Sequence, residues 1–224
     1  MRPTPLLIIG GGGFARETLE LIRAVNAVTP TCRVMGILDD DERMHGHRIH
    51  GNPVIGPSEA VHEYPDALVA VCVASPDNPA GRLALVDRLG LRSERYATLV
   101  HPSAVVPHSA SIGSGSVLHA GTVLTADVTL GSHVAIMPRV VLTHDDRVGD
   151  GVTFGAGVCV AGGVTIGDAA YVGSGALLRE HVVVGNGSVI GMGAVVTHSV
   201  PPGEIWAGVP ARLLRTTSTL AGAR

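Results

Sequence analysis

The sequence predicts two architectures in one chain: a small α/β domain first, then a parallel β-helix. Three observations support this. Residues 100–196 place an apolar residue at every sixth position, seventeen times without a break. A glycine follows that apolar residue at intervals of eighteen. Ahead of this region, residues 6–22 join a short apolar run, four glycines and a segment with helical spacing.

The six-residue period fits neither a helix nor a flat sheet, which place apolar residues every three or four and every two positions. It describes a chain that coils around a triangular prism, with one short strand per side. Successive coils then lie ~4.8 Å apart, as strands in any sheet do. The region is therefore predicted to be a β-helix of hexapeptide repeats. We expect the periodic glycines at one corner, with backbone angles closed to other residues: Gly113, Gly131, Gly149, Gly167 and Gly185.

Composition narrows the function classes. The net charge of −3 gives no reason to expect a nucleic-acid partner. Three scattered cysteines have no metal-site spacing and suit a reducing, cytoplasmic location. No signal peptide and no membrane-spanning stretch is expected, so no membrane partner is predicted.

The chain begins with a predicted strand at residues 6–9, a glycine turn at 10–13 and a helix from residue 14. This order directs backbone N–H groups and a helix N-terminus at a phosphate. Gly10, Gly12 and Ala15 fit a loose G-x-G-x-x-A pattern, which also occurs in tight turns that bind nothing.

Further strands are predicted at residues 33–38, 68–73 and 96–100, with a helix around 83–89. The acidic run 39–41 follows the first of these strands, where carboxylates can bind a ribose or stay solvated. Residues 1–98 thus form a Rossmann-like half domain, which suits a mononucleotide better than NAD. The loop with His45, His47 and His50 could bind a metal, but no ligand in a regular element accompanies them, so no metal is expected.

The predicted rod spans residues 99–200, and its clearest break in pattern is the polar run 143–147. His144 falls two positions past an inward residue, so we expect it at a corner and partly exposed. The adjacent carboxylate of Asp145 would favour the tautomer and the charged form that a general base needs. Four other histidines on the rod are expected to be solvated corners: His119, His133, His181 and His198.

Prolines end the repeat after residue 200, and residues 201–224 are predicted to be a C-terminal loop and cap. A loop followed by a short helix would cover the open edge of the last coil. Arg212 and Arg215 are candidate contacts for a phosphate-bearing cofactor, or solubilising charges.

The rod, the His144-Asp145 pair, the run 190–196 and the segment 208–212 resemble the left-handed β-helix acyltransferases. With residues 6–17 included, nearly the whole chain is similar to the sugar O-/N-acyltransferase family. This family holds the sialic acid O-acetyltransferases and the N-acetyltransferases of nucleotide-linked 4-amino-sugars.

The resemblance implies a left-handed coil and a homotrimer whose sites lie in clefts between rods, with acetyl-CoA along each cleft. It implies that His144 takes the proton from the acceptor, that Asp145 strengthens this base, and that the Gly162 N–H stabilises the oxyanion. Cofactor contacts are implied for Thr153, Ser174 and Met192, with Arg212 added from the tail; nucleotide contacts are implied for Gly12, Gly13, Phe14, Asp39 and Asp40.

Two positions depart from the family pattern. Thr153 stands where some relatives have a second histidine, and residues 74–76 stand where several have a glycine and asparagines. The sequence is therefore predicted to encode an acetyl-CoA-dependent acetyltransferase acting on the 4-amino group of a nucleotide-activated deoxysugar, by direct attack without an acyl-enzyme. The alternatives are O-acetylation of a sugar or natural-product hydroxyl, and a non-catalytic, oligomeric nucleotide-binding protein.

Overall fold

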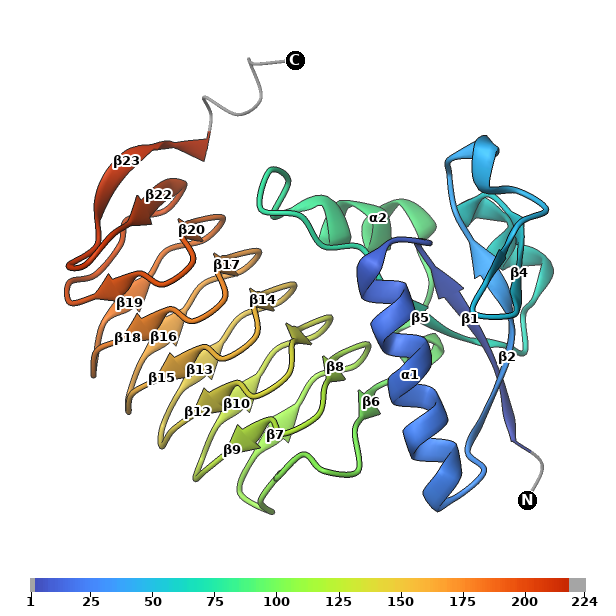
Figure 1. Ribbon diagram of the computed structural model, residues 1–224, viewed down its shortest axis with the longest axis horizontal. Coiled ribbons are helices and arrows are strands. Elements are labelled where there is room, and N and C mark those ends of the chain that lie inside the picture. Colours follow the sequence, from blue (N-terminus) through green and yellow to red (C-terminus); the bar gives the residue numbers. More distant parts are fainter. Residues whose placement is uncertain (1–2, 218–224) are drawn as a thin grey trace.

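The computed structural model of the 224-residue chain describes residues 3–217. An α/β domain occupies one end and a three-walled rod the other, with the polypeptide passing from one to the other once (Figure 1). The predicted combination of an α/β domain and a parallel β-helix is confirmed. Within the described residues, no helix has both the length and the apolar character to span a bilayer.

The N-terminal domain is built on a five-stranded sheet in the order β3-β4-β2-β1-β5. Its strands are parallel except β3, which pairs antiparallel with β4. The strands are β1 (Thr4–Ile9), β2 (Cys32–Leu38), β3 (Arg48–Ile49), β4 (Asn52–Gly56) and β5 (Leu68–Val71). The helices are α1 (Gly13–Val28) and α2 (Gly81–Leu89), with the short 3-10 segments η1 (Glu42–Met44), η2 (Ser58–Glu63) and η3 (Ser93–Arg95).

The rod has three walls of two-residue strands, and before the last coil each strand pairs in parallel with the residues eighteen positions further on. The first wall contains β6 (Leu99–Val100), β8 (Val117–Leu118), β11 (Ala135–Ile136), β14 (Thr153–Phe154), β17 (Tyr171–Val172) and β20 (Val189–Ile190). The second wall contains β9 (Val123–Leu124), β12 (Val141–Leu142), β15 (Cys159–Val160), β18 (Leu177–Leu178) and β21 (Val195–Val196). The third wall contains β7 (Ser111–Ile112), β10 (Thr129–Leu130), β13 (Arg147–Val148), β16 (Thr165–Ile166) and β19 (Val183–Val184).

The inward residues of these strands form one core that runs along the rod axis. Phe154 is its one aromatic residue with no exposed surface, and the aliphatic residues of the neighbouring coils stack above and below it. The six-residue pattern therefore identified the core side chains from Leu118 to Val196, whereas Val106, which it also placed inward, is 37% exposed.

The periodic glycines are needed for a different reason from the one predicted. None of the five adopts a positive φ. Each lies flat against the next coil: a Cβ on Gly149 would come within 2.8 Å of Asp168 N, and one on Gly185 within 2.6 Å of Pro202 Cα. The left-handed corner positions belong to other residues, among them Gly163 and Asp145, with φ of 72° and 62°.

The C-terminal cap is a pair of strands, so the predicted helix over the last coil is wrong. β22 (Glu204–Ala207) adds in parallel to β20, and β23 (Arg212–Thr216) pairs antiparallel with β22. Two strands satisfy the backbone edge that β20 leaves open, which a helix would not do. The remainder of the predicted cap, residues 218–224, lies outside the described residues.

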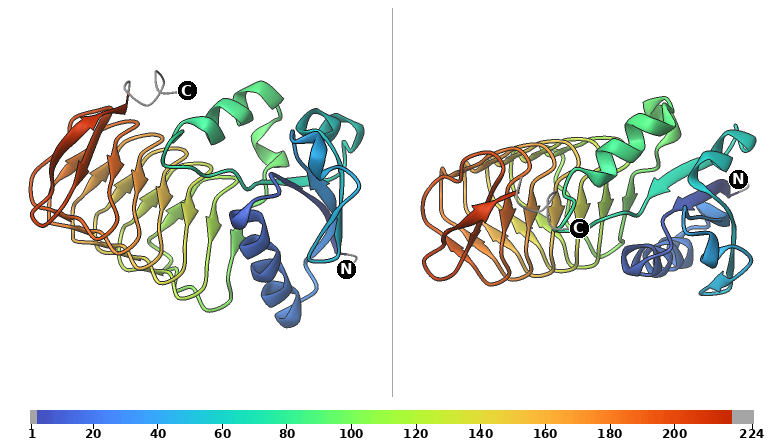
Figure 2. Two further views of the ribbon diagram at one scale, coloured as in Figure 1. Left: turned by 45° about the horizontal axis from the view of Figure 1, so that its top comes forward. Right: turned by 90° about the horizontal axis from the view of Figure 1, so that it is seen from above.

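The N-terminal domain packs on the first wall of the rod. One apolar cluster runs from Leu19 and Ile22 of α1 through Leu99 to Val117 and Ala135 of the wall. In both views of Figure 2, α2 lies along the flank of the rod, with the sheet beyond its first coils. The segment predicted as a last strand of the domain is shared: Tyr96 bridges in parallel to Val69 of β5, and Leu99–Val100 form β6 of the rod.

This packing buries two histidines that were expected to be solvated. His119 is 4% and His133 is 6% exposed. Their rings contact Phe14 and Tyr96 of the domain. Burial, with a smaller contribution from His101, lowers the pKa of His119 to about 4, so this ring stays neutral near pH 7.

Candidate functional site

His144 lies at the corner where the second wall turns into the third. Its Nδ1 is 2.8 Å from Asp145 Oδ2, and both side chains are largely exposed, at 63% and 67%. Asp145 adopts a left-handed φ of 62°, which lets two consecutive side chains face each other. A carboxylate on Nδ1 holds the proton there and leaves Nε2 free to accept another.

Gly162 occupies the equivalent corner of the next coil, directly beside the imidazole. A Cβ at this position would come within 2.9 Å of His144 Nδ1 and closer to two other ring atoms. Gly163 N donates to His144 O at 2.8 Å, while the Gly162 N–H has no acceptor among residues 3–217. The structure thus places the candidate base beside Gly162, whose backbone N–H has no acceptor among these residues.

A second carboxylate, Asp146, lies beneath this corner and has no exposed surface. Its Oδ2 accepts from Thr143 N at 3.0 Å and its Oδ1 from Val164 N at 2.9 Å. Burial raises the pKa of Asp146 to about 6, although both hydrogen bonds oppose the rise. The sequence marked the position as unusual, because Asp146 stands in an otherwise small or apolar column, but gave it no role.

Ser174 and Met192 share the corner between the first and second walls, on adjacent coils. A Cβ on Gly173 would lie 2.6 Å from Met192 N, and Met192 itself is 80% exposed. Along the same corner, a groove of about 720 Å³ is lined by Arg139, Val141, Cys159 and their neighbours. In this chain, the corner of Ser174 and Met192 and the corner of His144 lie on opposite edges of the second wall.

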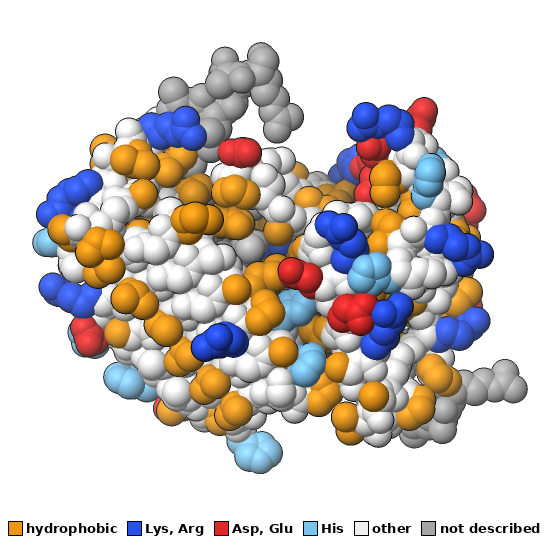
Figure 3. Space-filling view, viewed as in Figure 1, with side chains coloured by type: hydrophobic (Ala, Val, Ile, Leu, Met, Phe, Trp, Pro, Cys, Tyr) orange, Lys and Arg blue, Asp and Glu red, His pale blue; other side chains and the backbone are white. Residues whose placement is uncertain are grey.

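The second wall presents an apolar outer face between those corners. The visible side of the rod carries many hydrophobic and few charged side chains (Figure 3). Leu177 of this wall is 46% exposed. The outward residues of the wall are Val123, Val141, Cys159, Leu177 and Val195.

Thr153 lies on the first wall under the N-terminal domain and is only 5% exposed. Its Oγ1 accepts a hydrogen bond of 2.7 Å from Arg82 of α2. The structure therefore does not bring its side chain to the exposed corner of Ser174 and Met192.

Arg82 is a buried link between the two parts of the chain that the sequence did not reveal. It is 3% exposed and donates to the carbonyls of Val73, Gly151 and Val152 at 3.0, 2.8 and 3.1 Å. Burial lowers the pKa of Arg82 to about 10, so the guanidinium remains charged at pH 7. No motif marks this residue, since its partners on the rod lie some seventy positions away.

The glycine turn of residues 10–13 lines a pocket of about 220 Å³ together with Phe14, Asp39 and residues 72–74. Gly12 is the N-cap of α1, so the first N–H groups of the helix face this pocket. Asp39 accepts from Gly11 N at 2.6 Å and from Asp41 N at 2.8 Å, which fixes its carboxylate at the rim.

Asp40 and Phe14 are less available than the sequence suggested. Asp40 binds Arg88 at 2.6 Å and accepts from Ser58 N at 2.8 Å. Partial burial works against these contacts, but together they lower the pKa of Asp40. The Phe14 side chain is 9% exposed and lies 6.0 Å from the His119 ring, which leaves its backbone for a ligand.

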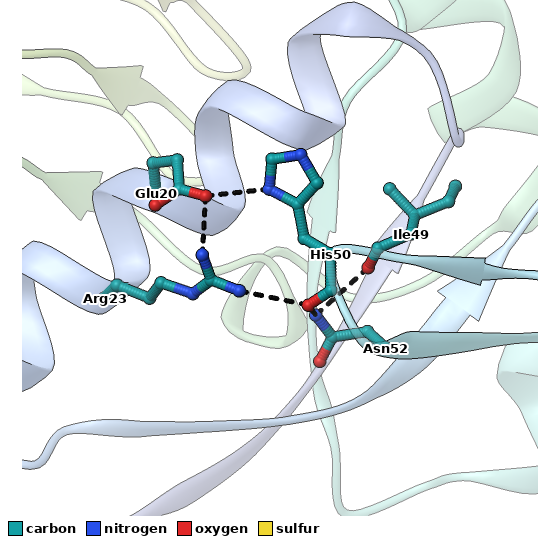
Figure 4. Close-up of polar contacts among 5 residues, drawn as sticks. All are labelled: Glu20, Arg23, Ile49, His50 and Asn52. Atoms are coloured by element: carbon teal, nitrogen blue, oxygen red, sulfur yellow. Dashed lines mark hydrogen bonds and ion pairs between the residues drawn. The ribbon is translucent and has the colours of Figure 1, made fainter.

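The loop histidines have separate partners. His50 Nδ1 is 2.7 Å from Glu20, which also binds Arg23, and this tie holds the β3–β4 hairpin to α1 (Figure 4). His45 Nε2 instead contacts Asp39 O at 2.7 Å. Among the residues that the structure describes, no three His, Cys, Asp or Glu side chains form a metal-binding group.

Arg212 begins β23 and is exposed; its Nη1 donates to Ala211 O at 2.7 Å. That bond lies within its own turn, so the guanidinium can reorient toward a ligand without breaking a tertiary contact.

Known proteins share both halves of this arrangement. Residues 5–89 match the PglD N-terminal domain, residues 103–126 the hexapeptide repeat of succinyl-transferase, and residues 163–198 the bacterial transferase hexapeptide (six repeats). The structure of PerB from Caulobacter crescentus, in complex with CoA and GDP-perosamine, is 30% identical with a TM-score of 0.82, and the match covers 94% of this chain and 97% of that chain. The chain belongs to this family of hexapeptide-repeat sugar N-acetyltransferases.

Two further members are similar. The acetyltransferase domain of PglB from Neisseria gonorrhoeae FA1090, in complex with acetyl coenzyme A, is 29% identical with a TM-score of 0.80, covering 95% of this chain and 100% of that domain. UDP-N-acetylbacillosamine N-acetyltransferase of Bacillus subtilis (strain 168) is 36% identical over 113 residues, and this match spans about half of each protein, 50% and 49%.

Membership of the hexapeptide-repeat sugar N-acetyltransferases confirms the predicted family. The match extends through the glycine turn as well as the rod. The departures at Thr153 and at residues 74–76 therefore occur inside a shared framework.

Proposed function

We propose that this protein transfers an acetyl group from acetyl-CoA to the 4-amino group of a nucleotide-linked deoxysugar, with His144 as general base. Family membership supports the reaction class, and similar proteins have been crystallised with CoA, acetyl-CoA and GDP-perosamine. The observation that carries the proposal is the exposed His144–Asp145 pair in contact with Gly162.

In the proposed reaction the acceptor amine attacks the thioester carbonyl while His144 Nε2 takes its proton. A C–N bond forms, and the oxyanion of the tetrahedral intermediate accepts from the Gly162 N–H. Collapse breaks the C–S bond, and the proton on His144 passes to the departing CoA sulfur. Asp145 keeps its contact with Nδ1 and stabilises the imidazolium between these steps.

We propose a homotrimer with the acetyl-CoA cleft between rods. Within one rod, the second wall separates the His144 corner from the corner of Ser174 and Met192. A cleft that contains both kinds of corner therefore requires a second protomer. The aliphatic outer face of the second wall supports such an interface, because monomers rarely leave a large continuous apolar patch in water. Arg139 and Arg212 are cations available to the phosphates of CoA.

The acceptor's nucleotide is proposed to bind at the glycine turn of the N-terminal domain. The free N–H groups of Gly12, Gly13 and Phe14 suit a diphosphate, and the fixed carboxylate of Asp39 suits a ribose hydroxyl or a base edge. Asp40, held by Arg88, would shape this rim and leave direct contact to Asp39.

Thiol release from acetyl-CoA, followed with UDP-, GDP- and dTDP-linked 4-amino-sugars, tests the function. We expect His144→Ala to lower kcat about 10²- to 10⁴-fold, as loss of a general base does. His198→Ala is the matched control, since this exposed histidine lies in the same column three coils away. Undiminished transfer by His144→Ala would contradict the role of His144 as general base. Absence of transfer by the wild type would leave a nucleotide-binding role. Transfer only to hydroxyl acceptors would replace N- by O-acetylation.

A further inference from the structure

Asp146 is out of place for a residue that only fills the core. Its column lines the corner between the second and third walls. The other members of the column are small or aliphatic: Ala110, Val128, Val164, Val182 and Val200. Burying a carboxylate costs free energy that a valine does not, even when hydrogen bonds offset much of it. The rod therefore folds its corner with alanine or valine in the other coils and with a carboxylate in one.

The two hydrogen bonds of Asp146 join two turns that carry different groups of the site. Oδ2 of Asp146 accepts from the N–H of Thr143, the residue immediately before His144. Oδ1 of Asp146 accepts from the N–H of Val164, which lies in the next coil, two positions after Gly162. Hydrogen bonds to a charged acceptor are roughly twice as strong as neutral ones, so one carboxylate clamps both turns.

Resting on the proposed function, we propose that Asp146 is a positioning residue that fixes the spacing between the imidazole of His144 and the N–H of Gly162. It touches neither substrate, because it has no exposed surface. Its effect reaches the reaction through the backbone of the two turns. Spacing at this point is sensitive, since the base and the oxyanion donor act on the same tetrahedral centre, and a displacement of about 1 Å can cost 10²-fold in rate.

Three variants of Asp146 test the proposal. Asp146→Val restores the valine of the neighbouring coils and removes both hydrogen bonds. Asp146→Asn keeps the shape, but its NH₂ group faces one of the two donors. Asp146→Ser retains one acceptor, as Ser116 does in another column, where its Oγ accepts from Val134 N at 3.0 Å.

We expect the Val and Asn variants to lower kcat about 10- to 100-fold, with KM for both substrates nearly unchanged. The Ser variant should retain intermediate activity. Ser116→Val is the matched control: it breaks the same kind of inter-coil bond far from His144 and should leave kcat unchanged.

The readouts separate a positioning role from a structural one and from failure of the function. A kcat for Asp146→Val within about twofold of the wild type would overturn the inference. So would a loss of activity that only follows a matching drop in Tm. If Asp146→Val does not fold, the isosteric Asn variant decides by the same criteria. If the wild type transfers no acetyl group, or His144→Ala is fully active, the proposed function fails instead.

Discussion

The buried carboxylate of Asp146 gives the rod a specific dependence on pH. Burial raises its pKa from 3.8 to about 6, so the folded state favours the protonated form. Its contribution to stability is therefore greatest below pH 3.8 and declines as the pH rises to about 6. Above that, the ionised group costs about 3 kcal/mol by linkage.

Asp146→Val should accordingly gain stability relative to the wild type as the pH rises. The lost hydrogen bonds add a constant offset, but the difference between the two proteins should change by about 2–3 kcal/mol from pH 4 to pH 8. Urea unfolding at intervals of pH measures this difference. For Ser116→Val, which removes no titratable group, the free energy of unfolding should change with pH in parallel with that of the wild type. Parallel curves for Asp146→Val would contradict the raised pKa.

Arg82 leads to a second expectation at the level of one residue. Arg82→Met leaves the carbonyls of Val73 and Gly151 without a donor, whereas the carbonyl of Val152 keeps its bond from Ala135 N. Buried acceptors without partners cost about 1–3 kcal/mol each, so we expect a loss of about 2–6 kcal/mol. Arg88→Met on the same helix is the control; it removes an exposed ion pair worth about 0–1 kcal/mol. Equal losses in chemical denaturation would refute the difference.

Sequence and structure agree on some residues and not others for a physical reason. His144 and Asp145 are neighbours in the chain, so their pairing could be predicted from the sequence. Arg82 meets its partners on the rod across 69 to 71 residues, and only the docking of α2 on the rod brings them together. The same docking buries His119 and His133, which rod periodicity alone treated as solvated corners.

Among elements, the corner glycines show how a correct pattern can have an incorrect explanation. The period of eighteen predicted where they are, but they serve close contact between coils and not unusual backbone angles. The short strands of the rod could be predicted from periodicity because each inward residue is apolar. The capping strands could not, because residues 203–216 contain no repeat and β23 takes its register from β22 alone.

Two glycine substitutions distinguish close contact between coils from unusual backbone angles as the reason for the periodic glycines. Gly149→Ala places a Cβ against the backbone of Asp168, so we expect at least about 3 kcal/mol of destabilisation or failure to fold. Gly187→Ala, at a left-handed corner with nothing within 4 Å of the added carbon, should cost only about 1 kcal/mol. Thermal unfolding compares them, and a larger loss at Gly187 would support the original explanation.

For the whole molecule, two exposed aliphatic residues on different walls test the proposed trimer. Leu177 projects from the second wall and Val183 from the third, with 46% and 47% exposure. If the second wall is the interface, Leu177→Glu should dissociate the protein and abolish acetyl transfer, because a buried unpaired charge is strongly unfavourable. Val183→Glu should do neither. Sedimentation velocity measures both, and an intact oligomer for Leu177→Glu would exclude the second wall.

The arrangement of the α/β domain on the rod was the feature that the sequence predicted least. Periodicity predicts a coil but sets neither its hand nor the wall on which the α/β domain docks. That choice follows from complementary apolar surfaces on α1 and the first wall, which belong to no local motif.

The pairing of strands within the repeat with residues eighteen positions ahead restricts how the gene can change in length. Loss or gain of one codon within the coils would shift every downstream side chain of the repeat out of its column, so that inward residues would point outward. An entire turn of eighteen codons could be duplicated or excised without that penalty. The rod is thus expected to tolerate insertions and deletions in multiples of one complete coil of eighteen residues.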